Sequence, residues 1–197
     1  MFSNGARSSA CGLAWDMDEF WVFGYGSLMW NPGFDYEMRV GALARGYRRS
    51  LCVRSFVHRG TPERPGLVLG LDRGGSCRGV AFRVADGKRE AVLDYLRARE
   101  LVTHVYLERQ LSVLLEDGRP VRAVGYVVDR SHSQYGGALT VEEAARIVQV
   151  SHGQSGPNDA YVANTVAHLK EMGIRDHWLE GVAARVADLQ ARTVAVA

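Results

Sequence analysis

The chain has few cysteines, and none of them lies close to another. The three cysteines, Cys11, Cys52 and Cys77, are an odd number without a short spacing between any two. A disulfide framework needs paired cysteines, and a zinc site needs ligands at short, regular spacings, so the pattern suits neither. We therefore expect reduced thiols, which are typical of a cytoplasmic protein.

Long apolar runs are also missing. No segment approaches the roughly 20 apolar residues that a membrane-spanning helix needs. Residues 1–18 carry Gly, Ser, Asn and one Arg but lack the apolar run of a signal peptide. We predict a cytoplasmic protein with no membrane partner, in which residues 1–18 form a flexible N-terminal segment and residues 19–197 form a single domain.

An excess of one charge is absent as well. The chain has 24 Lys and Arg against 22 Asp and Glu, a net charge of +2, and basic residues alternate with acidic ones. This balance argues against a nucleic-acid partner. The six histidines show no H-x-x-x-H spacing, so we expect no metal site. The hydrophobic content of 47% is near the average for a globular protein, and a chain of 197 residues can bury a sizeable core.

The pattern of apolar residues predicts strands first and helices last. The expected strands cover residues 20–23, 39–56, 66–72, 76–84, 104–116 and 120–129, with a turn at Asp117–Gly118 before the last strand. Val92, Leu93 and Leu96 lie on one face of a predicted amphipathic helix over residues 86–100.

Helices are expected from Thr140 to the end of the chain. Thr140 and Glu143 match a capping box that opens a helix. A second helix is expected to start near Pro157 as its first helical residue, and a third to run from about 175 to 190. This order predicts an α+β fold, with a small, mixed or antiparallel β-barrel flanked by helices.

The segment Gly24-Tyr25-Gly26-Ser27-Leu28-Met29 follows the first expected strand. It is not a dinucleotide-binding loop, because Met29 stands where a third glycine is needed and Pro32 prevents a helix from opening there. Two interpretations remain. The more common one is a turn at the end of a strand, and the other is a nest of backbone N–H groups that binds an anion or oxyanion.

The segment Gly153-Gln154-Ser155-Gly156-Pro157 resembles a serine-hydrolase nucleophile elbow only in part. Pro157 replaces the final glycine, and a helix rather than a strand is expected before it. We interpret it as a helix start capped by Ser155 or Gly156. The exposed N–H groups of a helix start also suit a carboxylate ligand.

Glu100 stands at the end of the helix expected over residues 86–100, before Leu101 and Val102. The negative end of the helix dipole and apolar neighbours both raise a carboxylate's pKa, whereas Arg97 and Arg99 act in the opposite direction. By position alone, a surface glutamate without a function at a fraying helix end is more common than a functional carboxylate there.

Several segments resemble the ChaC-type γ-glutamylcyclotransferases, and they occur in the same order along the chain. The matching segments are Val22–Trp30, His58–Pro62 with Pro65–Leu69, Cys77–Phe82, Tyr95–Leu96 with Arg99–Glu100, and Ser155–Gly156 with Asn158 and Tyr161. Together they extend from about Trp21 to Tyr161, which is most of the chain. Each match is weak alone, and the set is specific.

This resemblance implies a small mixed β-barrel flanked by helices and a reaction without cofactors, in which glutathione gives 5-oxoproline and cysteinylglycine. It assigns Glu100 as the acid/base. The loop Tyr25, Gly26, Ser27 and Leu28 is expected to hold the γ-glutamyl group, and Tyr161 to line the pocket. The candidates for contacts with the cysteinylglycine part are Asn158 and the basic loop His58–Arg64, in which Arg59 or Arg64 could bind the distal carboxylate.

Two alternatives stay open at this point. A related cyclotransferase could prefer other γ-glutamyl peptides or amines, and the sequence does not distinguish the two. A non-catalytic binding or regulatory protein could use the same fold. The presence of Glu100 argues against the second alternative, because a pseudo-enzyme is expected to lose its acid/base.

Overall fold

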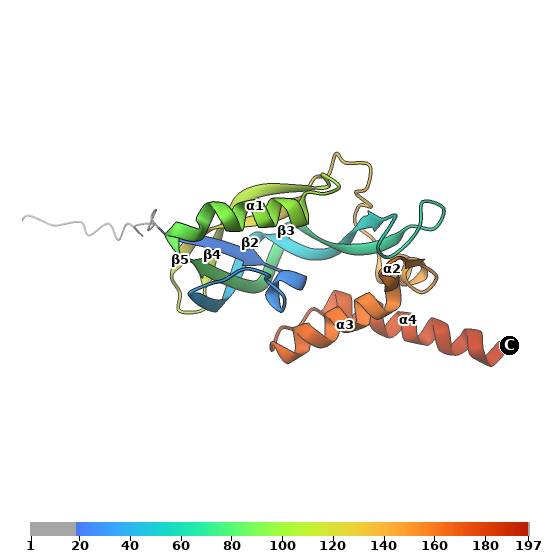
Figure 1. The fold of residues 1–197 in the computed structure, drawn as a ribbon. Helices are drawn as coiled ribbons and strands as arrows, with labels where there is room; N and C mark the ends of the chain where they lie inside the picture. The colour runs from blue at the N-terminus through green and yellow to red at the C-terminus, as the bar shows by residue number, and fades with distance from the viewer. Residues whose placement is uncertain (1–18, 197) are drawn as a thin grey trace, which may run out of the picture.

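Five strands close into a barrel in the computed structural model, which describes residues 19–196 (Figure 1). The strands are β1 (Phe20–Gly24), β2 (Met38–Ser55), β3 (Gly66–Val84), β4 (Tyr106–Leu115) and β5 (Pro120–Val128). β3 pairs antiparallel with β1 and β2, and β4 pairs antiparallel with β2 and β5. β5 pairs parallel with β1 and, at Leu71↔Val127, with β3. The barrel is therefore mixed, as predicted.

The helices lie on two sides of this barrel. α1 (Arg89–Glu100) lies along the barrel, and α2 (Val141–Val148), α3 (Asn158–Glu171) and α4 (His177–Val196) gather on the opposite side (Figure 1). The short elements are the 3-10 helices η1 (Ser27–Met29) and η2 (Asp86–Lys88) and the two-residue strands β6 (His152–Gly153) and β7 (Gly156–Pro157). None of the helices within residues 19–196 is long and apolar enough to cross a membrane.

The strands expected over residues 66–72 and 76–84 form one strand, β3. Gly74 and Gly75 adopt φ angles of 97° and 75°, and the pairing with β2 shifts its register between Arg45 and Tyr47. A bulge of this kind bends and twists a strand pair without ending it. The two glycines therefore mark a bend rather than the predicted break.

The capping box at Thr140 is confirmed, because its hydroxyl accepts from the Glu143 N–H while the Glu143 carboxylate accepts from the Thr140 N–H. The predicted start of the next helix is wrong by one residue. Pro157 is extended, with φ −68° and ψ 148°, and precedes α3, and no side chain caps the helix. Gly156 and Pro157 pair with β6, which holds them out of the helix.

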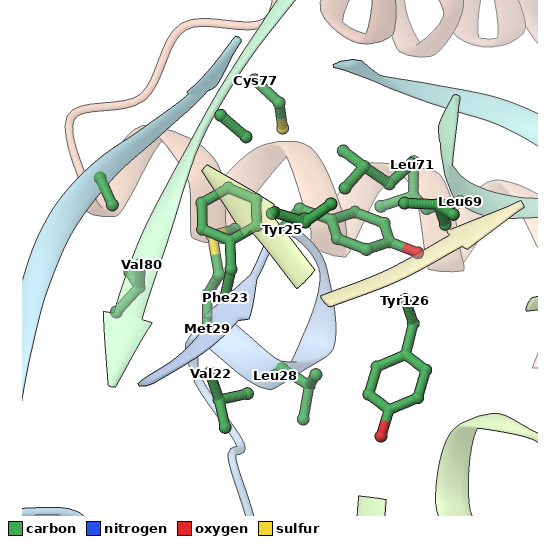
Figure 2. Packing of buried hydrophobic residues seen from close by; sticks show 14 of the residues in the cluster. Val22, Phe23, Tyr25, Leu28, Met29, Leu69, Leu71, Cys77, Val80 and Tyr126 are labelled. Carbon is green, nitrogen blue, oxygen red and sulfur yellow. The ribbon is translucent and has the colours of Figure 1, made fainter. Parts of the chain in front are cut away.

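One hydrophobic cluster fills the barrel and continues into α2, α3 and α4. Figure 2 shows the side chains of Phe23, Met29 and Val80 inside the barrel, with the Tyr25 ring directed toward Leu69. A shared cluster supports the single domain expected over residues 19–197, which stays a prediction. The expected flexible segment, residues 1–18, lies outside the described residues.

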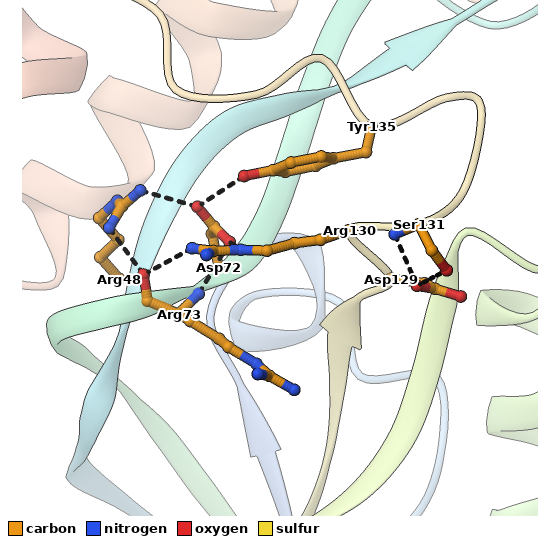
Figure 3. Close-up of polar contacts among 7 residues, drawn as sticks. All are labelled: Arg48, Asp72, Arg73, Asp129, Arg130, Ser131 and Tyr135. Carbon is orange, nitrogen blue, oxygen red and sulfur yellow. Dashed lines mark hydrogen bonds and ion pairs between the residues drawn. The ribbon is translucent and has the colours of Figure 1, made fainter.

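A buried carboxylate fastens the connection after β5 to the β2–β3 pair. Asp72 on β3 has a fully buried side chain (Figure 3). It accepts hydrogen bonds from Arg48 Nη2 and Arg130 Nε, both at 2.7 Å, from the Arg73 N–H at 2.8 Å and from the Tyr135 hydroxyl at 3.3 Å. Burial alone raises the pKa of Asp72, but these donors outweigh it and hold the pKa below its ordinary value.

We predict that Asp72→Asn lowers the free energy of unfolding by about 2 kcal/mol at pH 7, because hydrogen bonds to charged groups contribute ~1.5–3 kcal/mol each and the arginines stay partly hydrated. Because the pKa of the Asp72 carboxyl is lower in the folded than in the unfolded protein, its charged form stabilises the fold at pH values above the pKa of the unfolded state. This stabilisation is lost as pH falls through the pKa of the folded state. The difference from the wild type should therefore shrink in acid. Urea unfolding at several pH values measures it, with the exposed Asp94→Asn as control. An Asp72→Asn difference as small as that of the control would contradict this role.

Candidate active site

A cavity of about 100 Å³ opens where the loop after β1 meets the end of α1. Its lining residues are Tyr25, Gly26, Ser27, Leu28, Val68, Leu69, Glu100, Tyr106, Tyr126 and Tyr161. They come from the loop after β1, from β3, β4 and β5, and from the helices α1 and α3. The structure thus brings together the loop, Glu100 and Tyr161, although 136 positions separate residues 25 and 161 in the sequence.

The loop presents free backbone N–H groups. Gly26 precedes η1, and the turn is closed by hydrogen bonds from Met29 N to Gly26 O at 2.9 Å and from Asn31 N to Ser27 O at 2.8 Å. Within residues 19–196, the N–H groups of Gly26, Ser27 and Leu28 donate to no other group. The first N–H groups of a helical turn lack partners inside the turn, so they are available to an oxygen atom of a ligand.

Glu100 is the last residue of α1, and its side chain is 20% exposed. Burial raises the pKa of the Glu100 carboxyl above its ordinary value, and the Arg99 guanidinium, whose Nε lies 3.2 Å from Oε1, acts in the opposite direction. Arg97, the other arginine that we considered from the sequence, instead forms a two-pronged pair with Glu108, with both N–O distances at 2.9 Å. The raised pKa and its cause match the expectation from the apolar neighbours of Glu100.

Arg99 joins the loop to α1. Its Nη2 donates to Ser27 Oγ at 3.0 Å, and its Nη1 donates to the Asn31 carbonyl at 2.8 Å and contacts the Tyr95 hydroxyl at 3.0 Å. The same side chain therefore contacts the loop and the Glu100 carboxylate. It fixes the position of the acid relative to the free N–H groups.

Two of the cavity tyrosines, Tyr106 and Tyr161, hold β3 through their hydroxyl groups. The Tyr106 hydroxyl donates to the Leu69 carbonyl at 2.6 Å, and the Tyr161 hydroxyl accepts from the Leu69 N–H at 3.2 Å. Burial raises the pKa of Tyr25, Tyr106 and Tyr161 above their ordinary value. Among the residues that line the cavity, Glu100 is therefore the acid whose pKa lies well below the pKa values of the tyrosines.

Two residues expected to bind substrate lie outside this lining. Asn158 is fully buried, and its amide is engaged with Leu67: Nδ2 donates to the carbonyl at 2.8 Å, and Oδ1 accepts from the N–H at 2.7 Å. It supports the β3 segment that forms one wall of the cavity. The Arg59 guanidinium lies 5.1 Å from the centroid of the Tyr161 ring and donates to the Ser155 carbonyl, so it stands beside the cavity.

Sequence reasoning missed Tyr106, Tyr126, Val68 and Leu69 as lining residues. Tyr106 had one available signal, because it begins a strand shortly after Glu100, but the chain has eight tyrosines. Among residues 19–196, no group of three or more His, Cys, Asp or Glu side chains is placed to hold a metal ion. The expected absence of a metal and of a cofactor stays a prediction.

Comparisons with known proteins identify the family and the fold. The family model described as ChaC-like protein matches residues 20–189. A glutathione-specific γ-glutamylcyclotransferase of Escherichia coli is 34% identical over 188 residues, covering 94% of this chain and 81% of that protein. Human glutathione-specific γ-glutamylcyclotransferase 1 is 35% identical over 163 residues, covering 80% of this chain and 73% of that protein. A crystal structure of a γ-glutamyl cyclotransferase specific to glutathione from yeast superposes with a TM-score of 0.76 at 25% identity, covering 87% of this chain and 99% of that one.

The burial of Glu100 predicts a pH-dependent cost to stability. A carboxyl whose pKa is higher in the folded than in the unfolded protein favours its protonated form in the folded state. The free energy of unfolding therefore falls as pH rises from the pKa of the unfolded state through that of the folded state. Glu100→Gln should therefore be more stable than the wild type at pH 7, and the two should converge near pH 4. Urea unfolding at both pH values measures this, with the exposed Glu90→Gln as control. A variant less stable than the wild type at pH 7 would contradict the prediction.

Proposed function

The chain belongs to the ChaC-like protein family, and from this premise we propose that it is a glutathione-specific γ-glutamylcyclotransferase. It would cyclise the γ-glutamyl group of glutathione to 5-oxoproline and release cysteinylglycine. The observation that carries the proposal is the position of Glu100, a largely buried carboxyl with a raised pKa in the same cavity as a loop with free N–H groups. The names of the relatives support glutathione as the substrate.

Glu100 supplies the proton transfers in this proposal. The α-amino group of the substrate attacks the γ-carbonyl carbon, but as an ammonium ion, with a pKa of about 8, it is not nucleophilic. The Glu100 carboxylate takes a proton from it, which frees the amine to attack, and passes this proton to the departing cysteinyl nitrogen as the carbon–nitrogen bond breaks. The ring nitrogen loses a second proton as the amide of 5-oxoproline forms, and the amino group of cysteinylglycine gains one as it leaves, so the protons balance. No water is consumed. A pKa above the ordinary glutamate range suits a group that must both accept and donate a proton near neutral pH.

The loop after β1 holds the folded substrate and its oxyanion. Ring closure is intramolecular, so the main contribution of the protein is to fix the conformation in which the amine reaches the carbonyl. The free N–H groups of Gly26 and Ser27 are suited to the oxygen that becomes negatively charged. Losing one such donor typically costs about 2.7–4 kcal/mol in transition-state stabilisation. Tyr25 and Leu28 provide further walls for the γ-glutamyl part, and Tyr161 closes the side next to Arg59.

Arg59 is suited to the distal carboxylate of glutathione. Its guanidinium lies over Tyr161 at the edge of the cavity, whereas the exposed Arg64 side chain makes no hydrogen bond, ion pair or ring contact in residues 19–196. An arginine offers paired donors to a carboxylate. The other candidate, Asn158, would act indirectly through its bonds to Leu67. The N–H at the start of α3 already donates to the Ser151 carbonyl at 2.9 Å, which makes that helix start a weaker candidate.

We also propose that the protein works in the cytoplasm on this small molecule, without a nucleic-acid or membrane partner. Cys52 and Cys77 are both free and buried, which suits a reducing compartment. Burial raises the pKa of the Cys52 thiol to about 12, so this thiol stays protonated and unreactive at neutral pH.

Glu100→Gln should lower turnover of glutathione by about 10²–10⁴-fold, because the amide keeps the size of the side chain but cannot carry a proton. Binding and folding should persist. Formation of 5-oxoproline by purified protein gives the rate, and calorimetric titration with glutathione gives the affinity. The exposed Glu90→Gln, on the first turn of α1, should keep wild-type turnover. Near-full turnover by Glu100→Gln would remove Glu100 from the mechanism.

Glutathione should exceed γ-glutamylalanine in kcat/KM by about tenfold or more, equivalent to roughly 1.4 kcal/mol. Binding energy from the distal carboxylate helps to hold the reacting end in its cyclising conformation. Arg59→Gln should reduce this ratio toward one, whereas Arg64→Gln should leave it unchanged. Steady-state kinetics on both substrates measures the ratio. Equal use of both substrates by the wild type would favour the broader γ-glutamyl cyclotransferase and leave the cyclisation itself intact.

A further inference from the structure

Arg49 on β2 is a buried arginine that contacts three separate parts of the chain. Only 4% of its side chain is exposed. Its Nε donates to the Tyr25 carbonyl at 2.6 Å, its Nη2 donates to the Arg78 carbonyl at 2.7 Å, and its Nη1 lies 3.2 Å from Asp176 Oδ2. It does not line the cavity that contains Glu100. It therefore contacts the candidate substrate loop without forming part of the cavity wall.

The bond to Tyr25 fixes the orientation of the peptide group that carries the Gly26 N–H. All peptide bonds in residues 19–196 are trans, so the carbonyl and the N–H of one peptide group point in opposite directions. Because the Tyr25 carbonyl points to Arg49, the Gly26 N–H points away from Arg49. This N–H has no acceptor in the described chain, and Tyr25 and Gly26 both line the cavity.

The charge on Arg49 also strengthens this N–H as a donor. A guanidinium that donates to a carbonyl polarises the peptide group, and hydrogen bonds in a chain reinforce one another when the surroundings exclude water. The Gly26 N–H would then be a better partner for a negatively charged oxygen than an ordinary amide.

Asp176 keeps Arg49 in place. Its Oδ2 pairs with Arg49, and its Oδ1 accepts from the Leu179 N–H at 3.1 Å in the first turn of α4. Its side chain is 15% exposed. A buried guanidinium without a counter-ion is costly, so Asp176 both neutralises Arg49 and ties it to the C-terminal helices.

We infer that Arg49 is a positioning residue that orients and polarises the Tyr25–Gly26 peptide group, so that the Gly26 N–H stabilises the oxyanion formed during cyclisation. Asp176 orients Arg49 in turn. This inference rests on the proposed function, because it assumes that the cavity beside Glu100 is where the γ-glutamyl group reacts.

A larger cavity on the other side of Arg49 makes a direct test possible. It has a volume of about 480 Å³ and is lined by Arg49 and Asp176 together with Trp178. Arg49→Ala would leave room there for a free guanidinium ion, which carries the same donors and charge, and the Asp176 carboxylate would attract it. We expect Arg49→Ala to lower kcat by about 10²–10³-fold, the usual effect of losing an oxyanion donor, with little change in KM.

Added guanidinium should raise the kcat of Arg49→Ala by about tenfold or more, because a hydrogen bond to a charged group is strong enough to change the rate by more than a factor of ten. The concentrations needed are far below those that unfold proteins. Urea, which has a similar shape but no charge, should not restore it. A residue with a purely structural role would not give this pattern. Arg48→Ala is the matched control: Arg48 neighbours Arg49 and lines the same cavity, but it contacts Arg73 and Asp72 instead of the loop. Its kcat should stay near wild type and should not respond to guanidinium.

Arg49→Lys keeps the test valid if Arg49→Ala does not fold. Lysine keeps the charge but lacks the planar fork that reaches three acceptors together, so kcat should fall at least about tenfold while KM holds. A kcat within twofold of wild type in Arg49→Lys, or guanidinium-independent loss in a folded Arg49→Ala, would overturn the inference. Wild-type protein and Glu100→Gln are assayed alongside. If the wild type forms 5-oxoproline from glutathione, such a result refutes the role of Arg49 alone. An inactive wild type refutes the proposed function as well, and a fully active Glu100→Gln removes Glu100 from the mechanism without touching the activity itself.

Discussion

Closure of the barrel through β3 is the constraint on which the site depends. β3 pairs with β1 and β2 and also meets β5 at Leu71, so it lies beside the loop that follows β1 and beside the strands that follow α1. The wall at Val68 and Leu69 then faces Glu100 across the cavity. The bulge at Gly74–Gly75 serves the same end, since it lets one continuous strand bend enough to keep all of these neighbours.

Side chains bonded to backbone groups provide the rigidity of the cavity. The Asn158 amide bonds to both the backbone N–H and the carbonyl of Leu67. The hydroxyls of Tyr106 and Tyr161 bond to the carbonyl and the N–H of Leu69. Arg99 and Arg49 hold the loop after β1 from two different elements. Buried backbone groups need partners, and these side chains satisfy them, whereas the N–H groups of Gly26, Ser27 and Leu28 have no acceptor in residues 19–196. A site built in this way is organised before substrate arrives, which is what stabilisation of a developing charge requires.

Glu100 illustrates the balance between stability and activity. Burial makes its charged form unfavourable, and Arg99 offsets only part of that effect. A carboxylate paired fully with arginines, such as Asp72, has a lowered pKa and is a poor proton acceptor near neutral pH. The fully buried Asp72 and the largely buried Glu100 therefore differ in their proton affinity because of the number of donors around them. Asp72 stabilises the connection after β5, and Glu100 is suited to proton transfer.

The sequence by itself determined the order of strands and helices, the capping box at Thr140, the position of Glu100 at a helix end and the resemblance to the family, because local periodicity and short motifs carry this information. It did not separate Arg97 from Arg99 as the partner of Glu100, place Asn158 under β3, or select Tyr106 among the tyrosines. Arg49 gave no signal at all, since its contacts reach residues 24 positions before it and 127 positions after it. Only the tertiary structure decided these roles, because barrel closure and helix packing bring together residues whose local patterns are independent of one another.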